Sequence, residues 1–174
     1  YYGPYRKVVR METPAGYFGW PTQVCGARMP QAAGESAWMP DNRSMNEHNV
    51  DERWMQRALD LASEAMYLSS PNPRVGCVLT DSAGQILGEG FTQAAGQAHA
   101  EIMALRDAQA RGHSTQGATA YVTLEPCSHQ GRTGPCCVTL ADAGVARVVV
   151  AGTDPNPLVS GQGLAYLRSR GIPV

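Results

Sequence analysis

The chain has 174 residues, which is enough for one ordinary domain and a tail, and its apolar fraction of 43% is sufficient for a hydrophobic core. Its net charge of -1 provides no bulk attraction to nucleic acid or to an anionic membrane, so we expect neither as a partner. The sequence contains no apolar run of about 18 residues, so a membrane span is not expected, and its first residues lack the apolar core of a secretory signal.

Residues 1–44 differ in composition from the rest of the chain. Ten of these 44 residues are Gly or Pro, and the aromatic residues follow no period. We interpret this segment as a leader that is disordered or not native to the protein, without a catalytic role; a partner-binding tail is the alternative. Met45 opens a polar stretch and is a natural start, so we expect the folded domain at residues 45–174.

The first expected element is a helix with Asp51 as its N-cap. Apolar residues then follow at helical spacing, namely Met55, Ala58, Leu59, Ala62 and Met66. Prolines at positions 71 and 73 end the helix, because proline is excluded from a helix interior.

The remaining elements alternate between strands and helices. They are expected as a hairpin of strands at 75–79 and 85–91, a helix from 99 to about 111, a strand at 118–124, a helix from 136 to about 143, a strand at 145–151, a helix at 163–170 and the start of a fifth strand at 172–174. This order predicts an α/β fold, a three-layer α/β/α sandwich with a mixed sheet.

The number of cysteines is odd, in a chain too large to need a disulfide framework. They are Cys25, Cys77, Cys127, Cys136 and Cys137. Metal binding in a reducing compartment is the better interpretation, so we expect a cytoplasmic protein.

One histidine and two of these cysteines have the chemistry of zinc ligands. His99 is expected to open a helix, Cys127 follows a strand, and Cys136 opens a second helix, whose N-terminus should lower the pKa of its thiol. Three protein ligands leave the fourth position of a tetrahedral zinc to water, as in catalytic sites. Cys137 and His129 are the alternative fourth ligands, but the Cys137 side chain should point elsewhere and the loop position of His129 favours substrate contact.

Glu101 lies two residues after His99, where a carboxylate can move protons without binding the metal. This H-x-E…P-C pattern is the signature of zinc deaminases. Zinc lowers the pKa of a bound water from 15.7 toward about 7. Glu101 would then transfer protons from that water to a ring nitrogen and to the leaving amine. The pattern predicts hydrolytic deamination but does not choose the ring.

From about Asp51 to Val174, about 70% of the chain, the sequence resembles the deaminase domain of bacterial RibD proteins of riboflavin biosynthesis, in the cytidine deaminase-like superfamily. The shared motifs are Pro-Asn-Pro-Arg-Val-Gly-Cys-Val at 71–78, Gly96 to Glu101, Thr-Leu-Glu-Pro-Cys-Ser-His at 123–129, Gly-Arg-Thr-Gly-Pro-Cys at 131–136 and 154–163. Eight residues separate Cys127 from Cys136, whereas cytidine, tRNA-adenosine and guanine deaminases place their cysteines two residues apart.

The resemblance implies a substrate, 2,5-diamino-6-(5-phosphoribosylamino)pyrimidin-4(3H)-one, which loses its 2-amino group as ammonia to give 5-amino-6-(5-phosphoribosylamino)uracil. It also implies that Asn72 and His129 hold the pyrimidine and that Arg132 pairs with the phosphate. A side-chain amide and a guanidinium suit these partners. The alternatives are a turn role for Asn72 and a solvated loop charge at Arg132.

The resemblance carries further expectations. Thr92 stands seven residues before the zinc histidine, where the family usually has histidine, and a hydroxyl replaces a hydrogen bond but not a cation. Bifunctional members continue into a reductase domain; the sequence up to Val174 contains only the deaminase part, so reduction is not assigned to it. Members assemble as dimers or larger, so a homo-oligomer is expected.

Two other functions remain open. A zinc deaminase of another base or nucleotide would share the chemistry, although the cysteine spacing and the lack of a basic patch argue against nucleic acid. The second alternative is a catalytically silent, zinc-stabilised scaffold. The presence of Glu101, Asn72 and His129 together argues against it, because a purely structural role requires none of these residues.

Overall fold

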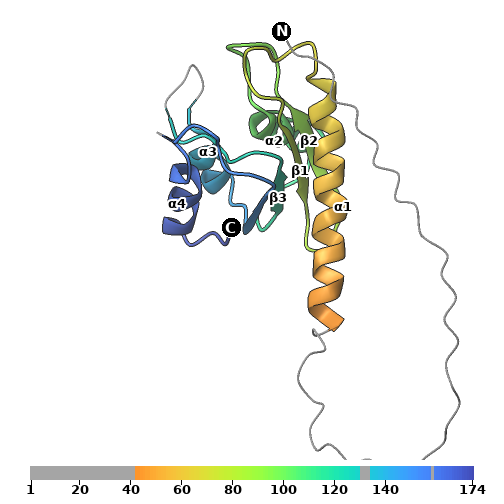
Figure 1. Cartoon of the computed structure of the whole chain (residues 1–174). Coiled ribbons are helices and arrows are strands. Elements are labelled where there is room, and N and C mark those ends of the chain that lie inside the picture. Colours follow the sequence, from red (N-terminus) through yellow and green to blue (C-terminus); the bar gives the residue numbers. More distant parts are fainter. Residues whose placement is uncertain (1–41, 130–133, 158) are drawn as a thin grey trace, which may run out of the picture. The chain divides into compact units, whose positions relative to one another are not determined.

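The computed structural model of the protein describes residues 42–129, 134–157 and 159–174, all within one compact unit, Met39–Val174. The predicted leader lies outside the described residues except for its last three, which belong to the first helix. The elements are, in chain order, α1 Asn42–Glu64, β1 Gly76–Thr80, β2 Ile86–Phe91, α2 Ala100–Ala110, β3 Thr119–Val122, α3 Cys136–Asp142, β4 Arg147–Val150 and α4 Gln162–Ser169 (Figure 1).

The four strands form one mixed sheet in the order β2-β1-β3-β4. β1 is antiparallel to both of its neighbours, with Cys77 opposite Gly90 on β2 and Val122 on β3. β3 and β4 are parallel, so the segments that follow them leave the sheet at the same edge. The predicted mixed sheet is confirmed.

Side chains alternate between the two faces of the sheet, and each face is covered by helices. Val78 and Tyr121 point to one face and pack with Trp54 of α1. Leu79 and Val122 point to the other face, in a core that also contains residues of α2, α3 and α4. Figure 1 shows α1 on one side of the sheet and α3 and α4 on the other. These three layers confirm the predicted sandwich.

Glycines on β2 let α2 lie close to the sheet. A Cβ added at Gly90 would come within 2.6 Å of the carbonyl oxygen of Ala100 and 2.5 Å of the backbone nitrogen of Ala104, which no real side chain tolerates. Gly88 is restricted in the same way by the carbonyl oxygen of Ala104. The first turn of α2, beside the predicted catalytic residues, is therefore fixed directly against the sheet.

The first helix begins earlier than the sequence predicted, at Asn42. Asp51 is therefore not an N-cap but lies inside α1, where its carboxylate accepts two hydrogen bonds from Arg147, at 2.8 and 2.6 Å. It also accepts one from the hydroxyl of Tyr121 at 3.1 Å. A residue type that favours helix starts is thus used for a long-range ion pair to β4. Within the part of the chain described, no helix combines the length and apolar character needed to cross a membrane.

The chain end does not form the fifth strand that residues 172–174 predicted. The carbonyl oxygen of Pro173 accepts one hydrogen bond, from the backbone nitrogen of Val148 at 3.0 Å. Because proline has no N–H to donate in return, this single bond does not extend into a ladder.

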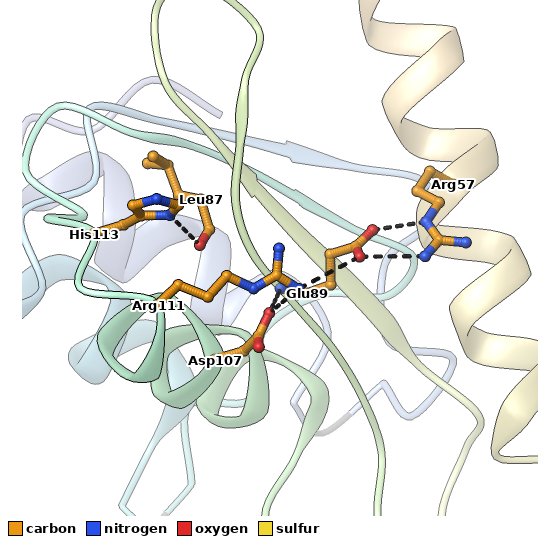
Figure 2. A network of polar contacts seen from close by, with 6 residues as sticks. All are labelled: Arg57, Leu87, Glu89, Asp107, Arg111 and His113. Atoms are coloured by element: carbon orange, nitrogen blue, oxygen red, sulfur yellow. Dashed lines mark hydrogen bonds and ion pairs between the residues drawn. The ribbon is translucent and has the colours of Figure 1, made fainter.

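The outer edge of β2 is closed by side chains rather than by another strand. The backbone nitrogen of Glu89 donates to Asp107 at 2.8 Å, and Nδ1 of His113 contacts the carbonyl oxygen of Leu87 at 2.9 Å (Figure 2). The side-chain amide of Gln93 donates to the carbonyl oxygen of Phe91 at 2.9 Å. These backbone groups at the edge of β2, which could otherwise pair with a strand of another chain, are therefore already hydrogen-bonded.

Candidate active site

Three side chains with metal-binding atoms converge from three separate elements. His99 immediately precedes α2, Cys127 follows β3, and Cys136 is the first residue of α3. Nδ1 of His99 lies 3.6 Å from Sγ of Cys127 and 3.4 Å from Sγ of Cys136. All three ligand atoms lie within 4.8 Å of one another. The structure therefore brings together the three residues that the sequence proposed as ligands.

The arrangement of these three atoms fits zinc. A tetrahedral zinc with ordinary Zn–N and Zn–S bond lengths places a nitrogen and a sulfur ligand about 3.6 Å apart, close to both observed separations. The two alternative fourth ligands, Cys137 and His129, do not join the group found within the described residues. The Cys137 side chain is instead buried in the core beside Leu140. The described ligand set thus leaves room for a fourth, exchangeable position.

Local structure explains why these side chains point toward one another. His99 is the N-cap of α2 but its side chain makes no capping hydrogen bond, so the imidazole is available to the cysteines. The first turn of α3 holds Cys127 by two hydrogen bonds. The backbone nitrogen of Cys136 donates to the sulfur of Cys127 at 3.4 Å, and the backbone nitrogen of Cys137 donates to the carbonyl oxygen of Cys127 at 3.2 Å. Two helix starts and one strand end therefore define the centre.

The thiols of the centre differ in acidity. The hydrogen bond from Cys136, ahead of that from His99, lowers the pKa of the Cys127 thiol to about 4. The same pairing with Cys127 raises the pKa of Cys136. The prediction of a lowered pKa for Cys136 is wrong, because the hydrogen bond with the Cys127 side chain, followed by burial, raises it. Cys127 supplies a thiolate of the kind that metals bind.

Glu101 lies in the first turn of α2, beside the three ligands. Only 3% of its surface is exposed, and burial raises its pKa to about 7. A carboxyl group with a pKa near neutrality can both accept and donate a proton at physiological pH, which is what general acid–base catalysis requires. This is the property that the sequence reading assigned to it.

A cavity of about 150 Å³ opens in front of Glu101. Its lining residues are Asn72, Pro73, Val75, Thr92, His99, Glu101, Leu124, Glu125, Cys127, His129 and Asp154. This volume is on the order of five liquid-water volumes, so it suits one small ring rather than a folded polymer. Apolar and polar groups share the lining, as in small-molecule sites.

The other residues singled out from the sequence have different positions. Asn72 and His129 both line the cavity, although they come from two different sequence motifs. Arg132 lies outside the described residues. Thr92 lines the cavity too, but its hydroxyl accepts a hydrogen bond from the nitrogen of Val75 at 3.3 Å and contacts the carbonyl oxygen of Val75 at 3.4 Å. Its hydroxyl is thus engaged by the backbone.

Sequence reasoning assigned no role to Glu125 and Asp154, which also line the cavity. One available signal could have found them. Both residues follow strands that the structure shows to be parallel neighbours, β3 and β4, and ligands of α/β sheets bind beyond the carboxyl ends of such strands. The sequence alone did not show that these two strands are neighbours.

Known proteins share this arrangement of motifs. The family described as the cytidine and deoxycytidylate deaminase zinc-binding region matches residues 48–152. The riboflavin biosynthesis protein RibD of Escherichia coli (strain K12) is 56% identical over 124 residues, which are 71% of this chain and 33% of that protein. The diaminohydroxyphosphoribosylamino-pyrimidine deaminase of Buchnera aphidicola subsp. Acyrthosiphon pisum is 49% identical over 119 residues, 68% of this chain and 78% of that protein.

Solved structures agree with these sequence matches. RibD from Acinetobacter baumannii superposes with a TM-score of 0.68 at 53% sequence identity, over 72% of this chain and 34% of that one. The chain thus spans about a third of the length of the RibD proteins it matches, and most of the length of the shorter Buchnera deaminase.

Proposed function

The chain belongs to the family of cytidine and deoxycytidylate deaminase zinc-binding domains, and we propose that it deaminates 2,5-diamino-6-(5-phosphoribosylamino)pyrimidin-4(3H)-one in riboflavin biosynthesis. Water replaces the 2-amino group, and the products are 5-amino-6-(5-phosphoribosylamino)uracil and ammonia. The observation that carries the proposal is the convergence of His99, Cys127 and Cys136 beside the buried carboxyl group of Glu101. The identity to relatives named for this activity selects the substrate.

His99, Cys127 and Cys136 would hold the metal. Zinc bound there would supply a Lewis acid that makes water a nucleophile at neutral pH. The thiolate of Cys127, stabilised by the N-terminus of α3, provides the negative charge that draws a cation to the site.

Glu101 transfers the protons of the reaction. It accepts a proton from the attacking water and passes it to the ring nitrogen beside the reacting carbon. It then takes the remaining proton of the hydroxyl group added to that carbon and delivers it to the amine, which leaves as ammonia while the carbonyl forms, so that one water is consumed for each ammonia released. The pKa of about 7 suits both steps, because neither protonation state is strongly disfavoured at neutral pH.

Asn72, His129 and Arg132 bind the substrate. The amide of Asn72 can donate to and accept from one edge of the pyrimidine, and His129, which lines the same cavity, contacts the ring. Arg132 pairs with the ribose phosphate, which a guanidinium binds through two parallel hydrogen bonds. The cavity has room for one small ring, which supports a small pyrimidine ribotide as the substrate.

The protein acts in the cytoplasm as a homo-oligomer. Reduced thiols at the metal centre support a reducing compartment. The resemblance to RibD proteins supports assembly into dimers or larger.

A substrate panel tests the proposal. Zinc-loaded protein is given the pyrimidinone ribotide, cytidine or guanine, and ammonia release is measured with each. We expect turnover of the ribotide at least 100 times faster than that of the other two, in the range that a site built around hydrogen bonds reaches by leaving its groups unpaired with the wrong ring. Preferred turnover of cytidine or guanine would assign the chain to another deaminase, and no turnover of any of the three would favour the scaffold.

A further inference from the structure

The carboxylate of Glu125 is buried and accepts three backbone hydrogen bonds. They come from the nitrogens of Gly161 at 2.8 Å, Gly163 at 2.9 Å and Asp154 at 3.2 Å. Glu125 is 7% exposed. A buried carboxylate needs such donors to offset its lost hydration. Three donors from one segment mean that this side chain and the segment that follows β4 stabilise each other.

Two of these donors belong to the start of α4. Gly161, at φ 81°, is the N-cap of this helix, and a glycine has no side chain that could cap it. The first N–H groups of a helix have no partner within the helix, and its N-terminus favours a nearby negative charge. Glu125 therefore caps α4 from another part of the chain.

The same start of α4 lies against the turn that carries a metal ligand. A Cβ added at Gly163 would collide with the carbonyl oxygen of Pro126 and would lie 3.3 Å from the carboxylate of Glu125. Pro126 directly precedes Cys127. The glycine thus allows the helix to approach the metal-binding turn as closely as two backbones can.

The third donor connects this clamp to the cavity. Asp154, whose nitrogen binds Glu125, lines the cavity together with Glu101 and His129. We propose that Glu125 is a positioning residue, whose carboxylate holds Asp154 and the start of α4 beside the turn of Cys127 and so fixes the wall of the substrate cavity. This role rests on the proposed deamination for its effect on activity. Both carboxylate oxygens are engaged by the backbone, so Glu125 acts through the wall and not on the ring.

Glu125→Gln tests this role, because glutamine keeps the shape but replaces one acceptor oxygen with a donor that faces an N–H group. Glu52→Gln, an exposed glutamate on α1, is the matched control. In Glu125→Gln we expect amide exchange at residues 154, 161 and 163 to accelerate about tenfold, the equivalent of one lost hydrogen bond. We expect KM for the ribotide to rise about tenfold, kcat to stay within about threefold and zinc to stay near one per chain, since His99, Cys127 and Cys136 are held by other elements.

Three results would overturn the role. Unchanged exchange at these amides would show that Glu125 does not hold the segment, and a fall in kcat with KM unchanged would place it in the chemistry. If Glu125→Gln raises KM only together with a loss of zinc or of thermal stability, and the amides exchange as in the unaltered protein, Glu125 has a general structural role.

A measurement on the unaltered protein remains decisive if the variant does not fold. The amides of Gly161 and Gly163 should exchange at least about tenfold more slowly than in an unstructured peptide, and exchange at the peptide rate would overturn the clamp. This exchange measurement does not depend on catalytic activity. If the unaltered protein does not turn over the ribotide, the proposed function fails while the exchange data still decide whether the amides of Gly161 and Gly163 are protected.

Discussion

Nδ1 of His99 lies 3.4 Å from Sγ of Cys136, although 37 positions separate the two residues in the chain. Each stands at the start of a helix, one on α2 and one on α3. Both helices pack on the same face of the sheet, so the fold itself sets this distance. The metal centre is therefore a consequence of how two helices begin.

Replacing Cys136 with alanine should remove the metal, because two protein ligands hold zinc far more weakly than three. Cys137→Ala is a matched control, since it removes a buried thiol from the same turn of α3 that does not join the ligand group. We expect zinc content near one per chain in the control and at least tenfold weaker zinc binding in Cys136→Ala, measured by competition with a chelator. Equal zinc content in the two variants would contradict the ligand assignment.

Arg132→Gln should weaken binding of the ribotide through its phosphate. A hydrogen bond to a charged group contributes about 1.5–3 kcal/mol, so KM should rise about 10- to 100-fold. The same variant should leave the much weaker turnover of the dephosphorylated nucleoside unchanged. Arg106→Gln, an exposed arginine on α2, is the control. Equal losses for the ribotide and the nucleoside would place Arg132 away from the phosphate.

Tyr121 should make the protein sensitive to alkaline pH. Burial, followed by the hydrogen bond to Asp51, raises its pKa to about 12 from the ordinary value of 10.0. The stability that it contributes is fully present below pH 10, where neither state ionises. It is lost as pH rises toward 12, because the unfolded chain gives up the proton first. Urea unfolding should show that the unaltered protein loses on the order of 2 kcal/mol more than Tyr121→Phe over this window. Parallel losses would refute the assignment.

Asp107 should protect the edge of β2. Asp107→Ala uncovers the backbone N–H of Glu89, whereas Arg111→Ala removes the ion pairs to Asp107 at 2.7 Å and to the Glu89 side chain at 3.9 Å and leaves that N–H covered (Figure 2). We expect Asp107→Ala to destabilise the protein by about 1 kcal/mol more and to self-associate at lower concentration, as followed by thermal unfolding and light scattering. Equal behaviour of the two variants would show that the edge does not depend on this cap.

The parts of the fold that the sequence predicted are those that depend on local pattern. Val75 to Leu79 is continuously apolar because the strand is buried on both faces, and His99 and Cys136 have the residue types and the helix-start positions of ligands. The start of α1 was missed because residues 42–50 have little apolar periodicity. The ion pair of Asp51 with Arg147 and the clamp of Glu125 join residues 96 and 29–38 positions apart, and no local pattern reports such contacts.

Ammonia release by Glu101→Gln, in protein with zinc near one per chain, tests the central claim most directly. Glutamine fills the same buried space but cannot accept or deliver the proton. General acid–base catalysis contributes about 10²- to 10⁴-fold, so turnover of the ribotide should fall by at least about 100-fold while zinc and folding are retained. Turnover within about twofold of the unaltered protein would show that Glu101 does not move the protons and would contradict the account.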